Sequence, residues 1–130
     1  VNVAQAACEM NLLAWAYGAD KGLRLRHWIL AFTQDEVRQF GSHVYPMLDH
    51  IARQAAAYYG SQYQIIYAVH MDWDHPHVHF VMNTVSYVTG RKYPGDKADY
   101  YAYQKYLGET LHPYGLYVMA VSDDGNRSDF

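Results

Sequence analysis

The spacing of apolar residues changes along the chain between a helical and a strand-like pattern. Apolar residues recur about every three or four positions over residues 4–18, which predicts a helix that ends at Gly18. Three later stretches concentrate apolar, β-branched and aromatic residues, and each of them predicts a strand. These strands cover residues 25–32, 63–70 and 77–86.

A long helix is predicted to follow the first of these strands. Thr33 and Glu36 form a capping box, in which each side chain accepts a hydrogen bond from the backbone N–H of the other residue. The helix is expected to run to about Tyr59, to bend near Pro46 and to end at Gly60.

The last part of the chain completes the order of elements. Gly and Pro mark residues 88–95 as a loop, and a tyrosine-rich helix is predicted over residues 97–111. Gly115 precedes a last expected strand over residues 116–121, and the polar tail from Ser122 is expected to fray. This order predicts an α+β fold, a two-layer sandwich with a mostly antiparallel central sheet and helices packed on it.

Length and composition limit the possible classes of protein. The 130 residues, 51% of them hydrophobic, are enough for one domain spanning residues 1–130. No apolar run reaches the length of about eighteen residues that a membrane helix needs, so no membrane insertion is expected. The single cysteine, Cys8, excludes an internal disulfide framework and fits a reducing cytoplasm. The net charge of −3 is not typical of a strong non-specific DNA binder.

Four of the eight histidines fall within residues 70–79, and their spacing indicates a metal site. Side chains alternate along a strand, so His77 and His79 project from the same face of the last strand. A short turn would bring His70, at the end of the preceding strand, opposite this pair. The result is three nitrogens on one face of the central strands, with coordination positions left open as in catalytic sites. A solvated histidine cluster and a structural zinc site are the alternatives, although structural zinc usually recruits thiolates.

Neighbouring polar residues have two interpretations each. Asp72 either accepts a hydrogen bond from a ligating imidazole or forms the turn, and Asp74 is expected to form the turn. His75 is expected to be a further metal ligand, to support a ligating histidine from behind, or to contact DNA. His27 either supports the triad from a neighbouring strand or is an ordinary strand histidine. Asn83 is expected to hold backbone in place.

The segment from His70 to Asn83 has the form His-x-Asp-x-x-His-x-His-x-His-Phe-x-x-Asn. It resembles the core motif of plasmid and transposon mobilisation relaxases, which belong to the histidine–hydrophobe–histidine (HUH) endonucleases. The likeness extends over most of the chain, including the strand at residues 27–32 with Glu36 after it, the loop at 90–93 and the helix at 99–103. Relaxases of this group are α+β sandwiches with the triad on a central antiparallel sheet, which agrees with the fold predicted above.

The resemblance implies a specific activity. Such enzymes bind single-stranded DNA at a transfer origin and nick one strand through a tyrosine that becomes linked to the 5′ phosphate, which initiates conjugative transfer or mobilisation. By motif position, His70, His77 and His79 would hold Mg²⁺ or Mn²⁺. The family further implies an accessory DNA-binding protein, a coupling protein of a secretion system, and a place in the bacterial cytoplasm.

The sequence does not identify the nucleophilic tyrosine. In the relaxases that this chain resembles, it precedes the segment that matches Val1, so the chain is expected to lack an N-terminal segment and its nucleophile. Replication-initiator and transposase nucleases of the same class offer an alternative, because they carry the tyrosine on a downstream helix, and Tyr101 with Lys105 has a similar spacing. A catalytically silent module that binds single-stranded DNA is the third interpretation. The candidates inside the chain are Tyr17, Tyr100, Tyr101, Tyr103 and Tyr106.

Overall fold

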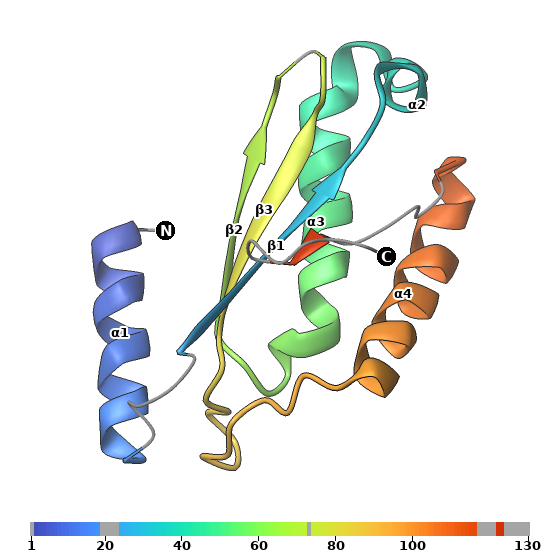
Figure 1. The fold of residues 1–130 in the computed structure, drawn as a ribbon. Coiled ribbons are helices and arrows are strands. Elements are labelled where there is room, and N and C mark those ends of the chain that lie inside the picture. Colours follow the sequence, from blue (N-terminus) through green and yellow to red (C-terminus); the bar gives the residue numbers. More distant parts are fainter. Residues whose placement is uncertain (1, 19–23, 73, 117–121, 124–130) are drawn as a thin grey trace.

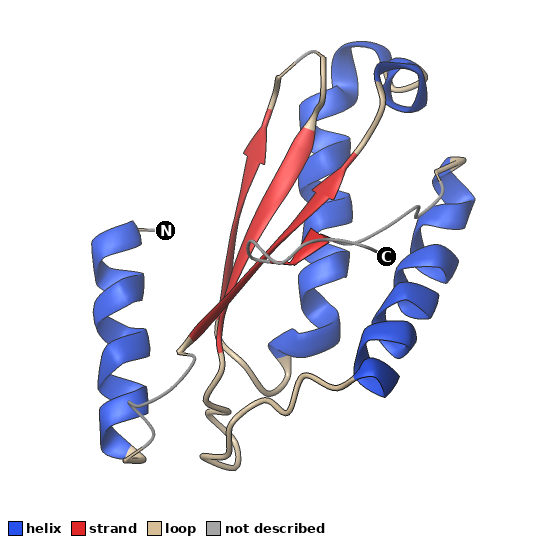
Figure 2. Ribbon diagram, viewed as in Figure 1, coloured by secondary structure: helices blue, strands red, loops and turns tan. Residues whose placement is uncertain are grey.

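A computed structural model describes residues 2–18, 24–72, 74–116 and 122–123 (Figure 1). Within these residues the sheet has the strand order β2-β3-β1-β4, and every neighbouring pair is antiparallel. The strands are β1 (Leu25–Ala31), β2 (Ile65–His70), β3 (His77–Asn83) and β4 (Ser122–Asp123). The helices are α1 (Val3–Ala16), α2 (Gln34–Arg38), α3 (Val44–Gly60) and α4 (Lys97–Leu111), with 3₁₀ turns at Gly41–His43 and His112–Tyr114. The predicted α+β sandwich is confirmed (Figure 2).

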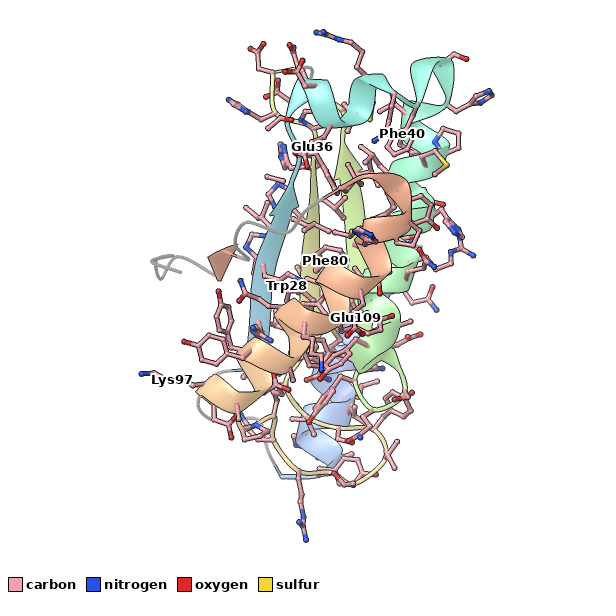
Figure 3. All side chains as sticks on the ribbon, turned by 90° about the vertical axis from the view of Figure 1, so that its right-hand side faces the viewer. Trp28, Glu36, Phe40, Phe80, Lys97 and Glu109 are labelled. Carbon is pink, nitrogen blue, oxygen red and sulfur yellow. The ribbon has the colours of Figure 1, made fainter. Side chains whose placement is uncertain are left out.

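The core lies between one face of the sheet and helices α3 and α4. Trp28 of β1 pairs with Phe80 of β3, and their rings stack with centroids 5.1 Å apart. Figure 3, viewed from the helix side, shows both residues behind α4. The two helices cover these rings with apolar side chains that are themselves buried, so this face of the sheet is dry. The covering residues include Leu48, Ile51, Ala52, Ala55, Tyr103 and Leu107.

The opposite face of the sheet is more open. The alternation along β1 and β3 places His27, Ile29, His79 and Val81 on this face, and all of them are partly exposed. Helix α1 lies on this side of the sheet, near the end of β3 (Figure 1). There the Asn83 side chain donates a hydrogen bond of 3.2 Å to a backbone carbonyl of α1. Asn83 therefore holds backbone, as predicted.

The single long helix predicted after Thr33 is wrong. The capping box is present, and it starts helix α2. This helix ends at Arg38, because Gly41 takes a left-handed conformation with φ of 57° that an α-helix cannot continue through. Helix α3 then begins at Val44. Pro46 falls in the first turn of α3, where a missing N–H costs nothing, so it does not bend the helix.

The strands predicted at 25–32, 63–70 and 77–86 are confirmed, with shifted ends. The strand expected at 77–86 stops at Asn83, and the backbone N–H groups of Thr84, Ser86 and Tyr87 donate instead to loop carbonyls of Arg24, Arg91 and Gln62. The strand expected at 116–121 falls, apart from Leu116, outside the described residues. Ser122 and Asp123, expected to be a frayed tail, pair with β1. No helix in the described ranges has the length and apolar character needed to cross a bilayer.

Gly90 ties the loop after β3 to the end of helix α1. Its φ is +74°, and a Cβ at this position would lie 2.3 Å from a ring carbon of Tyr17. We expect Gly90→Ala to lower the free energy of unfolding by about 2 kcal/mol, because a left-handed backbone and a steric clash both penalise it. Urea denaturation followed by circular dichroism measures the change. Gly60→Ala is the matched control, since Gly60 ends a helix with open space around it. Equal stability of the two variants would contradict this interpretation of the loop.

Candidate metal centre

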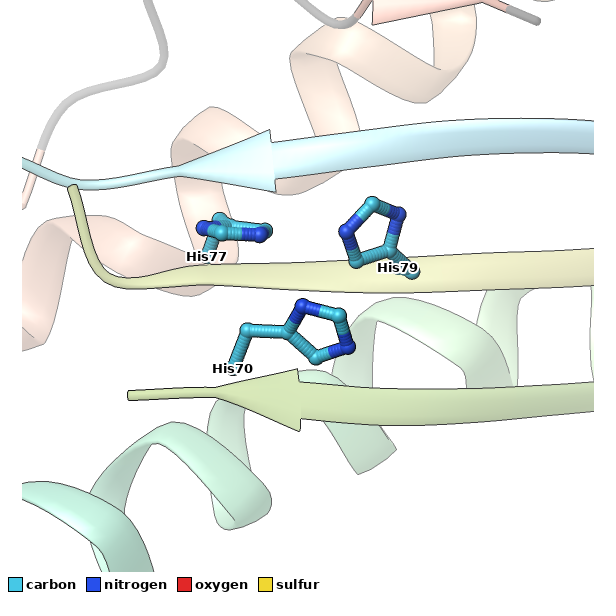
Figure 4. A group of neighbouring side chains, drawn as sticks. All are labelled: His70, His77 and His79. Carbon is cyan, nitrogen blue, oxygen red and sulfur yellow. The ribbon is translucent and has the colours of Figure 1, made fainter. Parts of the chain in front are cut away.

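The turn between β2 and β3 brings three histidines together. His70 pairs directly with His77, and His79 lies opposite Ala68, so all three side chains project from one face of the sheet. Their ring centroids are 4.4 to 4.8 Å apart. One ring nitrogen of each lies within 4.8 Å of the others, a grouping that could hold a metal ion. Figure 4 shows the three rings on one side of the strands, with the helices behind the sheet.

Backbone hydrogen bonds fix this turn. Asp72 accepts a hydrogen bond from the backbone N–H of Asp74 on its side chain, at 3.1 Å, and from that of His75 on its carbonyl, at 3.0 Å. The carbonyl of buried Pro76 accepts a hydrogen bond of 2.9 Å from the backbone N–H of Phe32, which ties the turn to the end of β1. The structure thus places the Asp72 carboxylate in the turn, as one of its two interpretations predicted. Asp74 lies exposed in the same turn.

Two of the three imidazoles have one ring nitrogen already engaged. Nδ1 of His77 lies 2.6 Å from the carbonyl oxygen of His75. A carbonyl can only accept, so Nδ1 of His77 donates to it, and in the neutral form of the ring the free lone pair is then on Nε2. Nδ1 of His79 lies 2.9 Å from Nε2 of His27, and the two rings are nearly parallel, with centroids 5.1 Å apart. Whenever Nε2 of His79 binds a metal, its Nδ1–H donates to His27.

Electrostatics keep the central imidazole neutral. Partial burial, followed by the positive charge that His70, His77 and His27 can carry, lowers the pKa of His79 below its ordinary value. A neutral ring has a free lone pair at physiological pH, whereas a protonated ring has none. The strand positions on this face carry no carboxylate in the described part of the chain. The donors that the described strands offer on this face are therefore imidazole nitrogens alone.

His27 and His75, the two other histidines predicted near the triad, contact it in different ways. His27 lies against the triad through its contact with His79, and its supporting role stays a prediction. The ring of His75 is exposed, and the contact of this residue with the site is made by its main-chain carbonyl. Sequence reasoning missed this contact, because a carbonyl contact leaves no signal in the identity of the side chain.

None of the five candidate tyrosines lies at the triad. Tyr17 packs against Gly90 at the far end of the molecule from the β2–β3 turn. The other four stand on α4, on the opposite face of the sheet (Figure 1). Tyr103 is buried there, and its hydroxyl donates to the carbonyl of Ala55 at 2.9 Å. Tyr103 therefore serves packing, Tyr101 is exposed away from the triad, and the downstream-helix arrangement of a replication initiator has no support in this geometry.

The comparison with protein families agrees with the site. The family model described as "Relaxase: MobA/VirD2-like, nuclease domain" matches residues 1–116. The chain belongs to this relaxase family. No curated protein and no solved structure matches it. The resemblance inferred from His70 to Asn83 is thus confirmed, and with it the assignment of the chain, at a coarse level, to DNA-nicking nucleases that act on single strands.

Metal binding is the first property of this relaxase to test. We expect the purified protein to bind Mn²⁺ at one site, and His77→Ala/His79→Ala to abolish that binding, because the variant removes two of the three ligand nitrogens. Isothermal titration calorimetry measures both. His43→Ala removes an exposed histidine of the 3₁₀ turn and should leave the titration unchanged. Equal binding by the double variant and the parent protein would contradict the assignment of the triad.

Proposed function

We propose that this relaxase nicks single-stranded DNA at a transfer origin in a metal-dependent transesterification, leaving a tyrosine joined to the 5′ phosphate. The observation that carries the proposal is the triad itself, in which His70, His77 and His79 meet on an open sheet face. Two of the rings are already oriented through Nδ1, so their Nε2 atoms are preorganised to bind the same ion.

The donor set bears on the choice of metal. Both ions favour oxygen ligands, but Mg²⁺ demands them and keeps its water, whereas the transition ion Mn²⁺ accepts imidazole nitrogen more readily. His70, His77 and His79 would hold the ion, and we propose Mn²⁺ as the better fit of the two ions considered. The bound ion would offset the negative charge that builds on the non-bridging oxygens of the scissile phosphate.

The protein's own residues prepare the surface for DNA. Ile29, Val81 and Ile66 lie on the triad face and are partly exposed, which offers an apolar floor for sugars and bases. The described strands carry no acidic side chain on this face, so the phosphates of a bound strand meet no repulsion there. We propose that the single strand crosses this face. The transfer origin, the accessory and coupling proteins and the bacterial cytoplasm belong to the same proposal, by family resemblance.

The nucleophile is proposed from the positions of the tyrosines. The described strands present no tyrosine on the triad face, since the only strand tyrosine, Tyr67, points to α3 and donates to Asp49. The tyrosines of α4 are on the helix side. We propose that the attacking hydroxyl comes from a tyrosine outside the described strands and helix α4.

His27 is proposed as a positioning residue for His79. We expect His27→Ala to weaken Mn²⁺ binding about 10- to 100-fold, since loss of the partner on Nδ1 frees the His79 ring to turn and to change tautomer. His27→Gln keeps a side-chain acceptor and should recover part of the affinity. Calorimetry measures the affinity, and ¹⁵N shifts of the imidazole reveal which His79 nitrogen carries the proton. An unchanged tautomer and affinity in His27→Ala would reject this role.

A covalent adduct tests the reaction. We expect single-stranded oligonucleotides labelled at the 3′ end to become attached to the protein when Mn²⁺ is present, and His77→Ala/His79→Ala to form no adduct. The label must be at the 3′ end because the tyrosine retains the 5′ phosphate of the downstream fragment. Denaturing electrophoresis detects the adduct, and mass spectrometry of the digested protein locates the tyrosine.

The position of the adduct separates the three functions. Tyr101→Phe is the matched control and should retain the adduct, because Tyr101 is exposed on the other side of the sheet. An adduct on Tyr101 would replace the relaxase reaction with that of a replication initiator. DNA binding without an adduct, in protein that includes any residues natively preceding Val1, would leave a silent binding module.

A further inference from the structure

A cavity lies on the helix side of the sheet, away from the triad. It has a volume of about 280 Å³ and opens between the end of α3, the loop that carries Tyr93 and the first turn of α4. This volume lies near the lower limit of small-molecule pockets and fits a single flat ring system. The lining residues are Tyr58, Tyr59, Gln62, Tyr63, Tyr93, Pro94 and Asp99.

The tyrosine walls are held in place before any ligand arrives. Tyr63 meets Tyr93 edge to face, with centroids 5.7 Å apart and planes at 84°. The Tyr59 hydroxyl donates to Oδ2 of Asp99 at 2.8 Å, and the Tyr93 hydroxyl donates to the same oxygen. Behind them, the guanidinium of buried Arg26 donates to the Tyr93 hydroxyl at 2.9 Å. The hydroxyls of Tyr59 and Tyr93 are thereby occupied, and their aromatic faces and that of Tyr63 remain for a ligand.

The polar groups of the cavity define the ligand's hydrogen-bonding edge. No described residue donates to the second carboxylate oxygen of Asp99, and no described residue binds the side-chain amide of Gln62. One wall thus offers an acceptor and the other an amide that can donate. Guanine presents two N–H donors beside one carbonyl oxygen on its Watson–Crick edge, which is the complementary arrangement.

Local charge favours a base over an organic cation. Tyrosine faces beside a carboxylate could in general hold an ammonium or guanidinium group. Here, however, the Arg26 guanidinium already lies over the rings of Tyr93 and Tyr59, at 5.0 and 5.8 Å from their centroids. A second cation would be repelled by Arg26, by the positive end of α4 and by exposed Lys97 (Figure 3). The same groups attract the phosphate that a nucleotide carries.

We propose that this cavity binds one guanine base of the DNA strand, with the ring against Tyr63 and Tyr93 and the N–H edge on Asp99. The proposal rests on the single-strand binding proposed above, and it adds a base-reading position remote from the nick. Strand β3 has seven residues, or about 20 Å, between His77 and the end that leads to this cavity. A DNA strand that occupies both the cavity and the triad therefore has several nucleotides between the guanine and the scissile phosphate.

Fluorescence anisotropy with short oligothymidylates tests the proposal. The parent protein should bind an oligothymidylate carrying one guanine about tenfold more tightly than the unsubstituted one, and more tightly than those carrying adenine or cytosine. Tyr63→Leu, which removes a stacking surface, and Gln62→Ala, which removes the amide of an exposed side chain, should lose this preference. Tyr45→Leu is the matched control, since Tyr45 is an exposed tyrosine at the other end of α3.

Several results would overturn the guanine site. These are equal affinity for all four oligonucleotides, or a guanine preference that survives in both cavity variants or disappears in Tyr45→Leu. Shifts of the Tyr63 ring signals in NMR spectra with tetramethylammonium, and none with guanosine monophosphate, would instead identify a cation cage. Adduct formation by the parent protein is measured separately. Nicking without a guanine preference rejects the cavity alone, while a preference without nicking rejects the reaction alone.

Discussion

The register between β2 and β3 is the constraint on which both the core and the triad depend. Val78, Phe80 and Met82 alternate with His77, His79 and Val81, and the first three are fully buried against the helices. Burying each of these apolar side chains stabilises the fold by about 2 kcal/mol. A slip of one residue would expose all three and push the two histidines into the core. The hydrophobic core thus holds the chemistry in place, although it lies on the other face of the sheet.

The same strand geometry explains why the triad can serve as a metal site without an acidic ligand. Neighbouring strands bring the three rings into contact. The backbone carbonyl of His75 engages Nδ1 of His77, and the ring of His27 engages Nδ1 of His79. Rings fixed in this way lose little further freedom when they bind an ion. The neutral donor set leaves the full charge of a bound cation facing solvent, where a phosphate can approach it. This reconciles a chain of net charge −3 with a DNA substrate, because charges more than about 10 Å apart are largely screened in salt.

The sequence predicted the features that depend on local spacing. The histidine pair at i and i+2 and the preceding strand were sufficient to place the triad, and the capping box at Thr33 correctly marked a helix start. The break at Gly41 escaped prediction because one left-handed glycine outweighed the helical pattern around it. The cluster of Arg26, Tyr59, Tyr93 and Asp99 also escaped, since its members come from four separate segments. Only tertiary packing brings such residues together, so no periodicity signals them.

Strand β1 connects the two functional regions through adjacent residues. Arg26 points to the helix side, where it supports the tyrosine walls of the cavity. His27 points to the triad, where it contacts His79. Successive side chains of a strand face opposite ways, and this alternation lets two neighbouring residues reach both faces of the sheet. A displacement of β1 would move both side chains together. Base recognition on one face and metal geometry on the other therefore depend on the same short segment of backbone, which the pairing of Trp28 with Phe80 anchors in the core.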